Sequence, residues 1–314
     1  MPNLVRAATR EVRSYAFDSA RWNGYEPRPD DIIVATYPKC GTTWTQRIVQ
    51  MLLDKDAAPK PMMMPWFDMR LFPFPLEMMM QNAASIPGRR QLKSHLPYDA
   101  LPIYEGVKFV HVARDGRDSA MSFHKHLYNF TPQMFERADA VNMADPKFGG
   151  PTPRAPADPG AYFTQWINGA DEFGDPGAGF WHMENSYWAA RRDPNMLLVH
   201  YSDLKADRDG EIRRIANFLD IDVPASVWPA IIDAAGFDRM REQGDTLMPN
   251  AETTWEGGAK TFINKGTNGR WKDVCAKEDL AAYDAKVKAN FSPALANWIE
   301  RGRLGAGDPR GMAD

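Results

Sequence analysis

The sequence predicts an α/β protein in which helices cover both faces of a parallel sheet. Two observations carry this prediction. Four short apolar runs, rich in β-branched residues, are typical of strands buried on both faces, because their apolar positions are continuous rather than alternating. Stretches with helical spacing of apolar residues separate these runs, and strands that alternate with helices build a parallel sheet. The predicted strands lie near 32–36, 90–94, 108–113 and 196–201.

Length and composition narrow the classes of function. The 314 residues contain no repeat and can bury a large core, so we expect one domain over 1–301 and a disordered tail over 302–314. The net charge of −3 gives no global basic field, which argues against a nucleic-acid partner. The two cysteines give neither a disulfide framework nor metal-ligand spacing, and no apolar run reaches the length of about 18 residues that spans a membrane. We therefore expect a cytoplasmic protein without a metal and without an integral membrane segment.

The segment 31–50, DIIVATYPKCGTTWTQRIVQ, predicts a strand, a tight loop and a helix. At such a junction the unpaired N–H groups of the helix start attract an anion. Lys39 adds a mobile positive charge, and Thr42 and Thr43 add hydroxyl donors. The alternative is an ordinary strand–turn–helix with a surface lysine. We favour a cradle for a phosphate or sulfate group.

A rival interpretation of this loop is the nucleotide-binding motif GxxxxGK(S/T), but the order differs, since Lys39 precedes Gly41 and Thr36 stands where the first glycine belongs. The loop YPKCGTTW resembles instead the 5′-phosphosulfate loop of the sulfotransferases, usually YPKSGTTW. These enzymes move a sulfuryl group from 3′-phosphoadenosine 5′-phosphosulfate (PAPS) to an acceptor. The resemblance implies that the cofactor-binding residues of this loop are Lys39, Cys40, Gly41, Thr42, Thr43 and Trp44.

Cys40 replaces the serine of that family loop. It lies beside Lys39 near a predicted helix N-terminus, where the pKa of a thiol tends to fall. We interpret it as a small spacer and a target for alkylation, and not as a nucleophile.

Methionine, proline, tryptophan and phenylalanine crowd together in residues 55–90 without a clean period. One interpretation is a loop that covers the core, with a short helix at 76–82. The other is the apolar wall of an acceptor pocket, whose adaptable methionines would suit a lipid-like or aromatic alcohol. The sequence leaves the two open. The candidates for the pocket wall are Trp66, Phe67, Phe72 and Phe74.

The stretch QLKSHLP, residues 91–97, predicts a strand that ends in a turn. Lys93 and His95 lie two residues apart, so both point to one face of an extended chain, at the strand end where parallel sheets bind ligands. An isolated histidine in a turn is more often a structural group. The stretch resembles the K-T-H-x-P segment of the sulfotransferases, however. The resemblance implies that His95 is the catalytic base and that Lys93 lies near the sulfuryl oxygens.

Arg114 follows the third predicted strand, and Ser122 lies one turn inside the helix predicted after it. An arginine fork and a hydroxyl near a helix start suit a phosphate monoester. The alternative is an arginine that pairs with Asp115 or Asp118. The spacing resembles the 3′-phosphate motif of the sulfotransferases, an arginine followed eight residues later by a serine.

The resemblance also implies that Ser122 acts in catalysis by holding Lys39 back until the acceptor binds. Ser122 belongs to a helix predicted over 119–127. His124 and His126 on that helix have no third ligand beside them, so we interpret them as packing or surface groups.

Two later segments resemble the parts of the family that contact adenosine. Tyr201 matches the tyrosine at the end of the fourth strand, although Ser202 replaces the usual glutamate. Phe237 and Met240 match the S-F-x-x-M segment that packs on adenine, while Gly236 stands where its serine belongs.

The last match is Phe262–Trp271, FINKGTNGRW, a Gly-rich basic loop that resembles RKGxxGDW. Asn264 stands where the 3′-phosphate arginine belongs, and Arg270 replaces the aspartate. Arg270 or Lys265 could take over the missing charge. The cofactor-binding residues implied here are Phe262, Lys265, Gly266 and Arg270.

Residues 128–180 form a long connection rich in proline and glycine, with a weak helical pattern at 162–168. Connections of this length in compact domains are usually functional, and we interpret this one as a lid over the acceptor side. Further helices are predicted over 181–192 and 210–219.

The six matches follow the family's order from Tyr37 to Trp271 and imply the P-loop NTPase-like fold of the sulfotransferases. The implied reaction moves the sulfuryl group of PAPS to a hydroxyl of a small-molecule or glycolipid acceptor, giving a sulfate ester and 3′-phosphoadenosine 5′-phosphate (PAP). One alternative is a P-loop nucleotide-dependent kinase, which would need magnesium. The other is a PAP-binding homologue without catalysis, against which the presence of Lys39, Lys93 and His95 argues.

Overall fold

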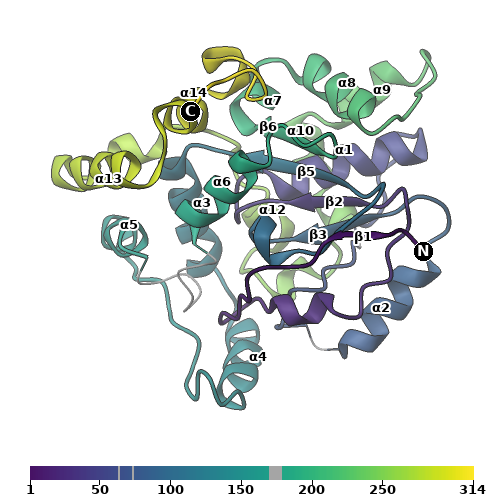
Figure 1. Ribbon diagram of the computed structural model, residues 1–314. Coiled ribbons are helices and arrows are strands. Elements are labelled where there is room, and N and C mark those ends of the chain that lie inside the picture. The colour runs from purple at the N-terminus through teal and green to yellow at the C-terminus, as the bar shows by residue number, and fades with distance from the viewer. Residues whose placement is uncertain (63, 73, 170–178) are drawn as a thin grey trace.

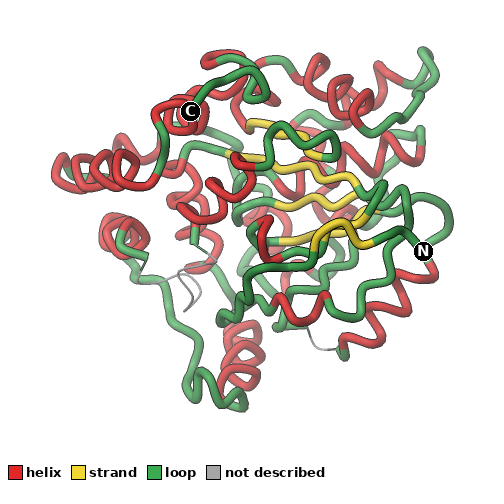
Figure 2. The backbone as a smooth tube through the Cα atoms, viewed as in Figure 1, coloured by secondary structure: helices red, strands yellow, loops and turns green. Residues whose placement is uncertain are grey.

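The computed structural model describes residues 1–62, 64–72, 74–169 and 179–314, and a four-stranded parallel sheet lies at its centre. The strand order is β3–β2–β5–β6, with β2 paired to β3 on one side and to β5 on the other (Figures 1 and 2). The predicted α/β class is confirmed. The strands are β2 (Ile32–Ala35), β3 (Gln91–Ser94), β5 (Lys108–Ala113) and β6 (Met196–His200).

Both faces of this sheet are buried. Side chains of β2 alternate between the faces, as the two-residue period of a strand requires. Ile32 and Val34 join one apolar cluster, and Ile33 and Ala35 join another on the opposite face. All four side chains are fully buried. The apolar run is therefore continuous because neither face meets water.

Each face is covered by its own set of helices (Figure 1). The cluster of Ile32 contains residues of α1 (Thr42–Asp54), α8 (Arg208–Phe218) and α9 (Trp228–Ala234). The cluster of Ile33 contains residues of α3 (Gly116–Tyr128), α5 (Pro159–Ile167) and α6 (Phe180–Ala189).

The helices predicted near 76–82, 119–127, 181–192 and 210–219 are confirmed, with ends shifted by a few residues, as α2, α3, α6 and α8. A short antiparallel pair holds the N-terminal arm against the body. The remaining elements are β1 (Leu4–Arg6), β4 (Ile103–Tyr104), α2 (Leu76–Ser85), α4 (Pro132–Met143), α7 (Tyr201–Ala206), α10 (Phe237–Glu242), α11 (Gly244–Leu247), α12 (Gly258–Phe262), α13 (Lys277–Asn290) and α14 (Pro293–Ala306).

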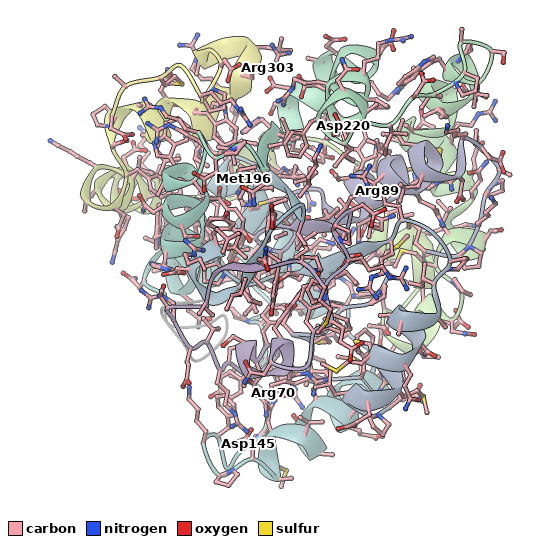
Figure 3. The ribbon with its side chains drawn as sticks, turned by 45° about the vertical axis from the view of Figure 1, so that its right-hand side comes forward. Arg70, Arg89, Asp145, Met196, Asp220 and Arg303 are labelled. Atoms are coloured by element: carbon pink, nitrogen blue, oxygen red, sulfur yellow. The ribbon has the colours of Figure 1, made fainter. Side chains whose placement is uncertain are left out.

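The connection 128–180 contains α4 and α5, and part of the predicted lid, residues 170–178, lies outside the described residues. Beyond the end of α4, Asp145 accepts hydrogen bonds from Arg70 and from Arg13 (Figure 3). These ion pairs tie the turn after α4 to the segment around Arg70 and to the N-terminal arm.

The C-terminal residues are packed on the body, so the disordered tail predicted over 302–314 does not match the structure. The carboxylate of Asp314 accepts hydrogen bonds from the indole of Trp188 at 2.6 Å and from Arg191 at 3.0 Å. Arg310 donates to the carbonyl of Met196 at the edge strand β6, at 2.7 Å. These charged contacts explain why a polar segment without apolar periodicity is held in place.

The single-domain organisation stays a prediction. In the described part of the chain, every helix is too short or too polar to cross a membrane.

Candidate active site

The carboxyl ends of all four parallel strands meet at one cavity, where open α/β sheets bind ligands. The loop after β2 supplies Lys39 and Gly41, and His95 follows β3. Arg114 follows β5, and Tyr201 follows β6 as the first residue of α7. The cavity has a volume of about 780 Å³. Segments far apart in the sequence are therefore brought together at one edge of the sheet.

The loop between β2 and α1 has a backbone suited to an anion. Lys39 and Gly41 have φ angles of +68° and +121°, in the left-handed region. A side chain at Gly41 would come within 3.1 Å of the Tyr201 ring, so glycine is needed here for packing as well as for its φ. No side chain caps the start of α1, which leaves its first N–H groups available. These features fit the phosphosulfate end of PAPS.

Two lysine ammonium groups at this loop lie over aromatic rings. The Nζ atom of Lys39 is 3.9 Å from the centroid of Phe262, and that of Lys93 is 3.4 Å from a ring centroid of Trp66. Burial, together with the charges of Lys93 and Arg114, lowers the pKa of Lys39 to about 7. Burial also lowers the pKa of Lys93 to about 7, although the carboxylate of Asp68 opposes this shift. A bound anion would stabilise both ammonium groups far better than a ring face.

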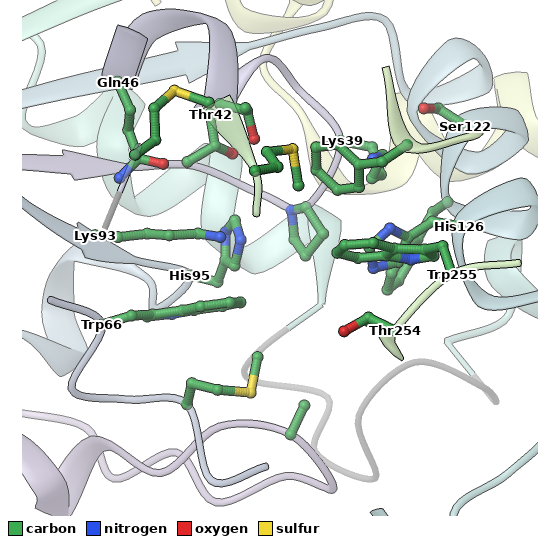
Figure 4. A pocket seen from close by; sticks show the side chains of 18 of the residues that line it. Lys39, Thr42, Gln46, Trp66, Lys93, His95, Ser122, His126, Thr254 and Trp255 are labelled. Carbon is green, nitrogen blue, oxygen red and sulfur yellow. The ribbon is translucent and has the colours of Figure 1, made fainter. Parts of the chain in front are cut away.

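His95 has the tautomer that a general base needs. Its Nδ1 atom is 2.6 Å from the carbonyl oxygen of Thr36, which can only accept, so Nδ1 carries the proton. Nε2 is therefore the basic nitrogen, and the ring lines the cavity beside Lys93 and Trp66 (Figure 4). Burial and the charge of Lys93 hold the pKa of His95 well below its usual value, so the imidazole is neutral at pH 7.

Asp68 is a supporting residue that no sequence motif marks. Its fully buried carboxylate accepts from the indoles of Trp22 and Trp66, at 3.1 and 3.0 Å. It also accepts from the backbone N–H of His95 at 3.0 Å. Asp68 thus fixes the cavity wall at Trp66 and the position of His95 with one side chain.

Arg114 faces the Gly-rich loop rather than the aspartates that follow it. Its guanidinium donates to Asn268 Oδ1 at 2.8 Å and to the carbonyl of Thr267 at 3.1 Å, and it lies 4.2 Å from the Tyr201 ring centroid. Asp115 instead pairs with Arg117, and Asp118 accepts from the backbone of Gly269. Arg114 is therefore held at the cavity with its fork turned toward the loop.

The Gly-rich loop packs closely on Phe237. A side chain at Gly266, where φ is +60°, would come within 2.6 Å of the Phe237 ring. The carbonyl of Gly266 accepts from Lys205 at 2.6 Å. Trp44, Tyr201, Phe237 and Met240 all line this part of the cavity. The four side chains make an apolar surface of the kind that a planar base packs on.

A small side cavity adjoins the cofactor loop. Arg270 and Ser122 both line it, together with Lys125 and Asn264. Asn264 Oδ1 is buried and has no hydrogen-bond partner among the described residues. Arg270 therefore lines the same small cavity as Asn264 and Ser122.

Most of the predicted site residues line the cavity, and two do not. Phe67 is part of the core, 5.2 Å from the Trp22 ring and fully covered, because its neighbour Trp66 faces the cavity. Cys40 points inward from the loop, with Sγ 3.2 Å from Ser119 Oγ. Burial raises the pKa of this thiol, so the predicted lowered pKa and ready alkylation are wrong. The predicted residues that line the main cavity are Lys39, Gly41, Thr42, Thr43, Trp44, Trp66, Phe72, Phe74, Lys93, His95, Arg114, Ser122, Tyr201, Phe237, Met240, Phe262, Lys265, Gly266 and Arg270.

The acceptor side of the cavity is largely apolar. Trp66, Phe72 and Phe74 form one wall, so the pocket interpretation of the Met- and Phe-rich stretch is consistent with the structure. Phe130 and Met134 of the connection 128–180 line it as well. His126, interpreted from the sequence as a packing or surface group, lines the cavity four residues after Ser122 on the same helical face (Figure 4). His124 is a packing group, bonded through Nε2 to the carbonyl of Pro156.

Comparison with known proteins agrees with this geometry. The Sulfotransferase domain model matches residues 29–294. The chain is similar to a glycolipid sulfotransferase of Mycobacterium bovis (strain BCG / Pasteur 1173P2), with 29% identity over 93% of this chain and 94% of the relative. It is also similar to sulfotransferase 1B1 of Canis lupus familiaris, with 28% identity over 85% of this chain and 86% of the relative.

Solved structures share the fold. Retinol dehydratase in complex with androsterone and the inactive cofactor PAP has a TM-score of 0.66 at 23% identity, over 85% of this chain and 82% of that one. Mouse sulfotransferase SULT7A1 complexed with PAP has a TM-score of 0.65 at 18% identity, over 93% of both chains.

The fold and the site define an enzyme of the PAPS-dependent sulfotransferase class. The chain belongs to the sulfotransferase family, since the family model covers most of its length.

Proposed function

We propose that this enzyme transfers the sulfuryl group of PAPS to a hydroxyl of an apolar small molecule or a glycolipid, giving a sulfate ester and PAP. The observation that carries the proposal is the position of His95. The His95 ring, whose basic nitrogen is Nε2, lines the cavity together with the two buried lysines and the apolar wall of Trp66 and Phe72. The name of the mycobacterial relative supports a glycolipid as one candidate acceptor.

PAPS supplies, when bound, a sulfuryl group on a phosphate leaving group. His95 takes the proton of the acceptor hydroxyl at Nε2, and Nδ1 stays bonded to Thr36. The ammonium of Lys39 neutralises the charge that develops on the leaving phosphate oxygen. The ammonium of Lys93 lies on the acceptor side of the loop and stabilises the sulfuryl oxygens.

Ser122 is proposed to restrain Lys39 before the acceptor binds. In the described chain Lys39 contacts the ring of Phe262, and no hydrogen bond joins it to Ser122. The proposed contact therefore needs the lysine side chain to turn away from Phe262. Both residues line the same side cavity, so the turn is short.

The donor is proposed to lie along the cofactor loop. The first N–H groups of α1 and the hydroxyls of Thr42 and Thr43 hold the 5′-phosphosulfate. Tyr201, Phe237 and Met240 pack on the adenosine. Arg114, Ser122, Lys265 and Arg270 are the remaining groups for the 3′-phosphate, and all of them line the cavity.

Thermal shift separates the three candidate functions. The protein with PAP, with ATP and with ATP plus magnesium is compared at equal ligand concentration, since a ligand that binds only the folded state raises the melting temperature. A sulfotransferase should be stabilised most by PAP. Stabilisation by ATP only with magnesium would favour a kinase. Incubation with PAPS and a panel of phenols, steroids, sugars and glycolipids, followed by mass spectrometry, then identifies the acceptor. PAP binding without any sulfated product would favour a non-catalytic homologue.

PAP binding is expected to weaken as the pH rises from about 7 to 9, with uptake of protons. Lys39 and Lys93 have pKa values of about 7 without a ligand, so both are charged below pH 7 and lose protons above it. The bound anion raises both pKa values, and each lysine must then regain a proton at higher pH. Calorimetry in two buffers of different ionisation enthalpy counts these protons.

The control for this count is Lys93→Met, which should remove about one proton of the uptake at pH 8 because one titrating ammonium is lost. Binding that takes up no proton at pH 8 in the unmodified enzyme would contradict the lowered pKa values.

Arg270→Ala is expected to weaken PAP binding by about 1.5–3 kcal/mol, the range for a charged hydrogen bond. A phosphate monoester carries close to two charges, and the Arg114 guanidinium already donates to Asn268 and Thr267, so a second cation is needed. Arg270 lines the side cavity with Ser122 and can supply the second fork. Affinity for adenosine 5′-phosphosulfate, which lacks the 3′-phosphate, should stay almost unchanged in calorimetry.

The matched variant is Arg270→Lys, which keeps the charge without the fork and should recover part of the loss. Equal losses on both ligands would show that Arg270 does not contact the 3′-phosphate. No loss on either would leave that role to Arg114, Ser122 and backbone donors.

We propose a cytoplasmic location for the enzyme. The observation in support is that Cys40 and Cys275 are both free thiols, as in a reducing compartment.

A further inference from the structure

His126 is surrounded by aromatic rings at the cavity wall. Its ring centroid lies 5.1 Å from those of Phe130 and Trp255, 5.7 Å from Phe262 and 5.9 Å from Phe123. Burial and the charge of Lys39 hold its pKa well below the usual value, so the imidazole is neutral at pH 7. A neutral imidazole offers one donor and one acceptor.

His126 and Trp255 both have an unused hydrogen-bonding atom. Nδ1 of His126 and Nε1 of Trp255 are buried and have no hydrogen-bond partner within the described chain. A buried polar atom without a partner costs about 1–3 kcal/mol. Phenylalanine at either position would pack in the same cluster without that cost. The two unpartnered atoms, on rings whose centroids lie 5.1 Å apart, therefore point to a ligand that bonds them.

Trp255 is held in position by its backbone. The residues on either side of it bond to the end of α3 and the turn that follows. The N–H of Thr131 donates to the carbonyl of Thr254 at 3.0 Å, and the N–H of Glu256 donates to that of Asn129 at 2.9 Å. The indole and the imidazole are thus fixed side by side, facing the cavity across from His95 (Figure 4).

The chemistry of the pair fits a hydroxyl rather than an anion. Indole is a donor only, and neutral imidazole both donates and accepts, so one hydroxyl can bond the two groups. Neither group is charged, and Lys39, Lys125 and Arg270 supply the positive charge of the small side cavity, which His126 and Trp255 line as well. A phosphate would therefore bind at those cations. The rest of the acceptor wall is apolar, so a second polar group of the acceptor has its match at this pair.

We propose that His126 and Trp255 form a subsite for a second hydroxyl of the acceptor, so that acceptors with a hydroxyl near the sulfated one are preferred over lone alcohols. This inference rests on the proposed function, in which the reacting hydroxyl lies at His95. The acceptor class is then an amphiphile with an apolar body and a diol or sugar head.

Binding to the PAP complex tests the subsite without requiring turnover. Dissociation constants are measured by calorimetry for 4-hexylphenol, 4-hexylcatechol and 4-hexylresorcinol, which share the apolar chain. The unmodified enzyme should bind at least one of the two diols about tenfold more tightly than the phenol, the factor for one well-made hydrogen bond. His126→Phe and Trp255→Phe keep the ring packing, and both should remove this preference.

The control is His124→Phe, on the same helix but outside the cavity, which should keep the preference. His126→Gln keeps one hydrogen-bond donor and one acceptor at this position, so it should retain part of the preference for diols. PAP affinity and the melting temperature of the PAP complex should be the same in the unmodified enzyme and in His126→Phe.

Three results would overturn the proposal: equal binding of phenol and diols by the unmodified enzyme, a preference that survives in both phenylalanine variants, or a loss of PAP affinity that shows the pair contacting the donor. Failure of the proposed function is a separate outcome. Diol preference without sulfated product from PAPS would refute the reaction and leave the subsite intact.

Discussion

Replacing His95 by alanine is expected to lower turnover by about 10²–10⁴-fold, the usual contribution of a general base, while PAP still binds. The reason is the tautomer. Nδ1 donates to Thr36, so Nε2 is the atom available to take the acceptor proton. The backbone N–H of His95 keeps its bond to Asp68 in the variant, so the wall should stay in place. Single-turnover rates with PAPS and PAP calorimetry separate the two effects.

The matched control is His124→Ala, which removes a histidine that bonds Pro156 outside the cavity. It should keep the rate of the unmodified enzyme. A His95→Ala variant that also keeps that rate would show that His95 is not the base.

Replacing Lys39 by alanine is expected to lower kcat by roughly 10²–10³-fold, as for removal of one preorganised group that stabilises developing charge. The effect should fall on kcat because the charge on the leaving oxygen is largest in the transition state. Steady-state kinetics with varied acceptor give kcat and KM separately.

The matched control is Lys55→Ala. It also puts alanine at a left-handed position, since Lys55 has a φ of +52°, but Lys55 lies exposed at the other end of α1. It should leave kcat unchanged. A Lys39→Ala variant that altered only acceptor affinity would contradict the role proposed for Lys39.

The fold was predictable because the strands are buried on both faces and so carry an unbroken apolar signal. Ile32 to Ala35 is the clearest case. The strand ends were predictable for the same reason, and they fix where Arg114 and Tyr201 meet.

The errors within the site concern the direction of single side chains. Trp66 and Phe67 are neighbours in a stretch without a period, and the packing of Phe67 on Trp22 and Tyr25 turns it into the core while Trp66 faces the cavity. Cys40 follows the rule for thiols at helix starts only if it is exposed, and the loop turns it inward.

The sequence contains a signal that could place His126 in the site, but it contains none for Asp68. His126 lies four positions after Ser122, so helical spacing could have placed it at the cavity. Asp68 gave no signal, because its three donors come from separate segments of the chain.

The lysines over their aromatic rings also bear on the last step of each catalytic cycle. When PAP departs, Lys39 and Lys93 lose the anion and return to Phe262 and Trp66, where their pKa values are about 7. Above neutral pH each ammonium can then give its proton to water, which makes departure of the product more favourable. Product inhibition by PAP should therefore ease in mildly alkaline solution, at the same pH at which capture of the donor becomes harder. The pH at which the enzyme turns over fastest would then reflect a compromise between filling the site and emptying it.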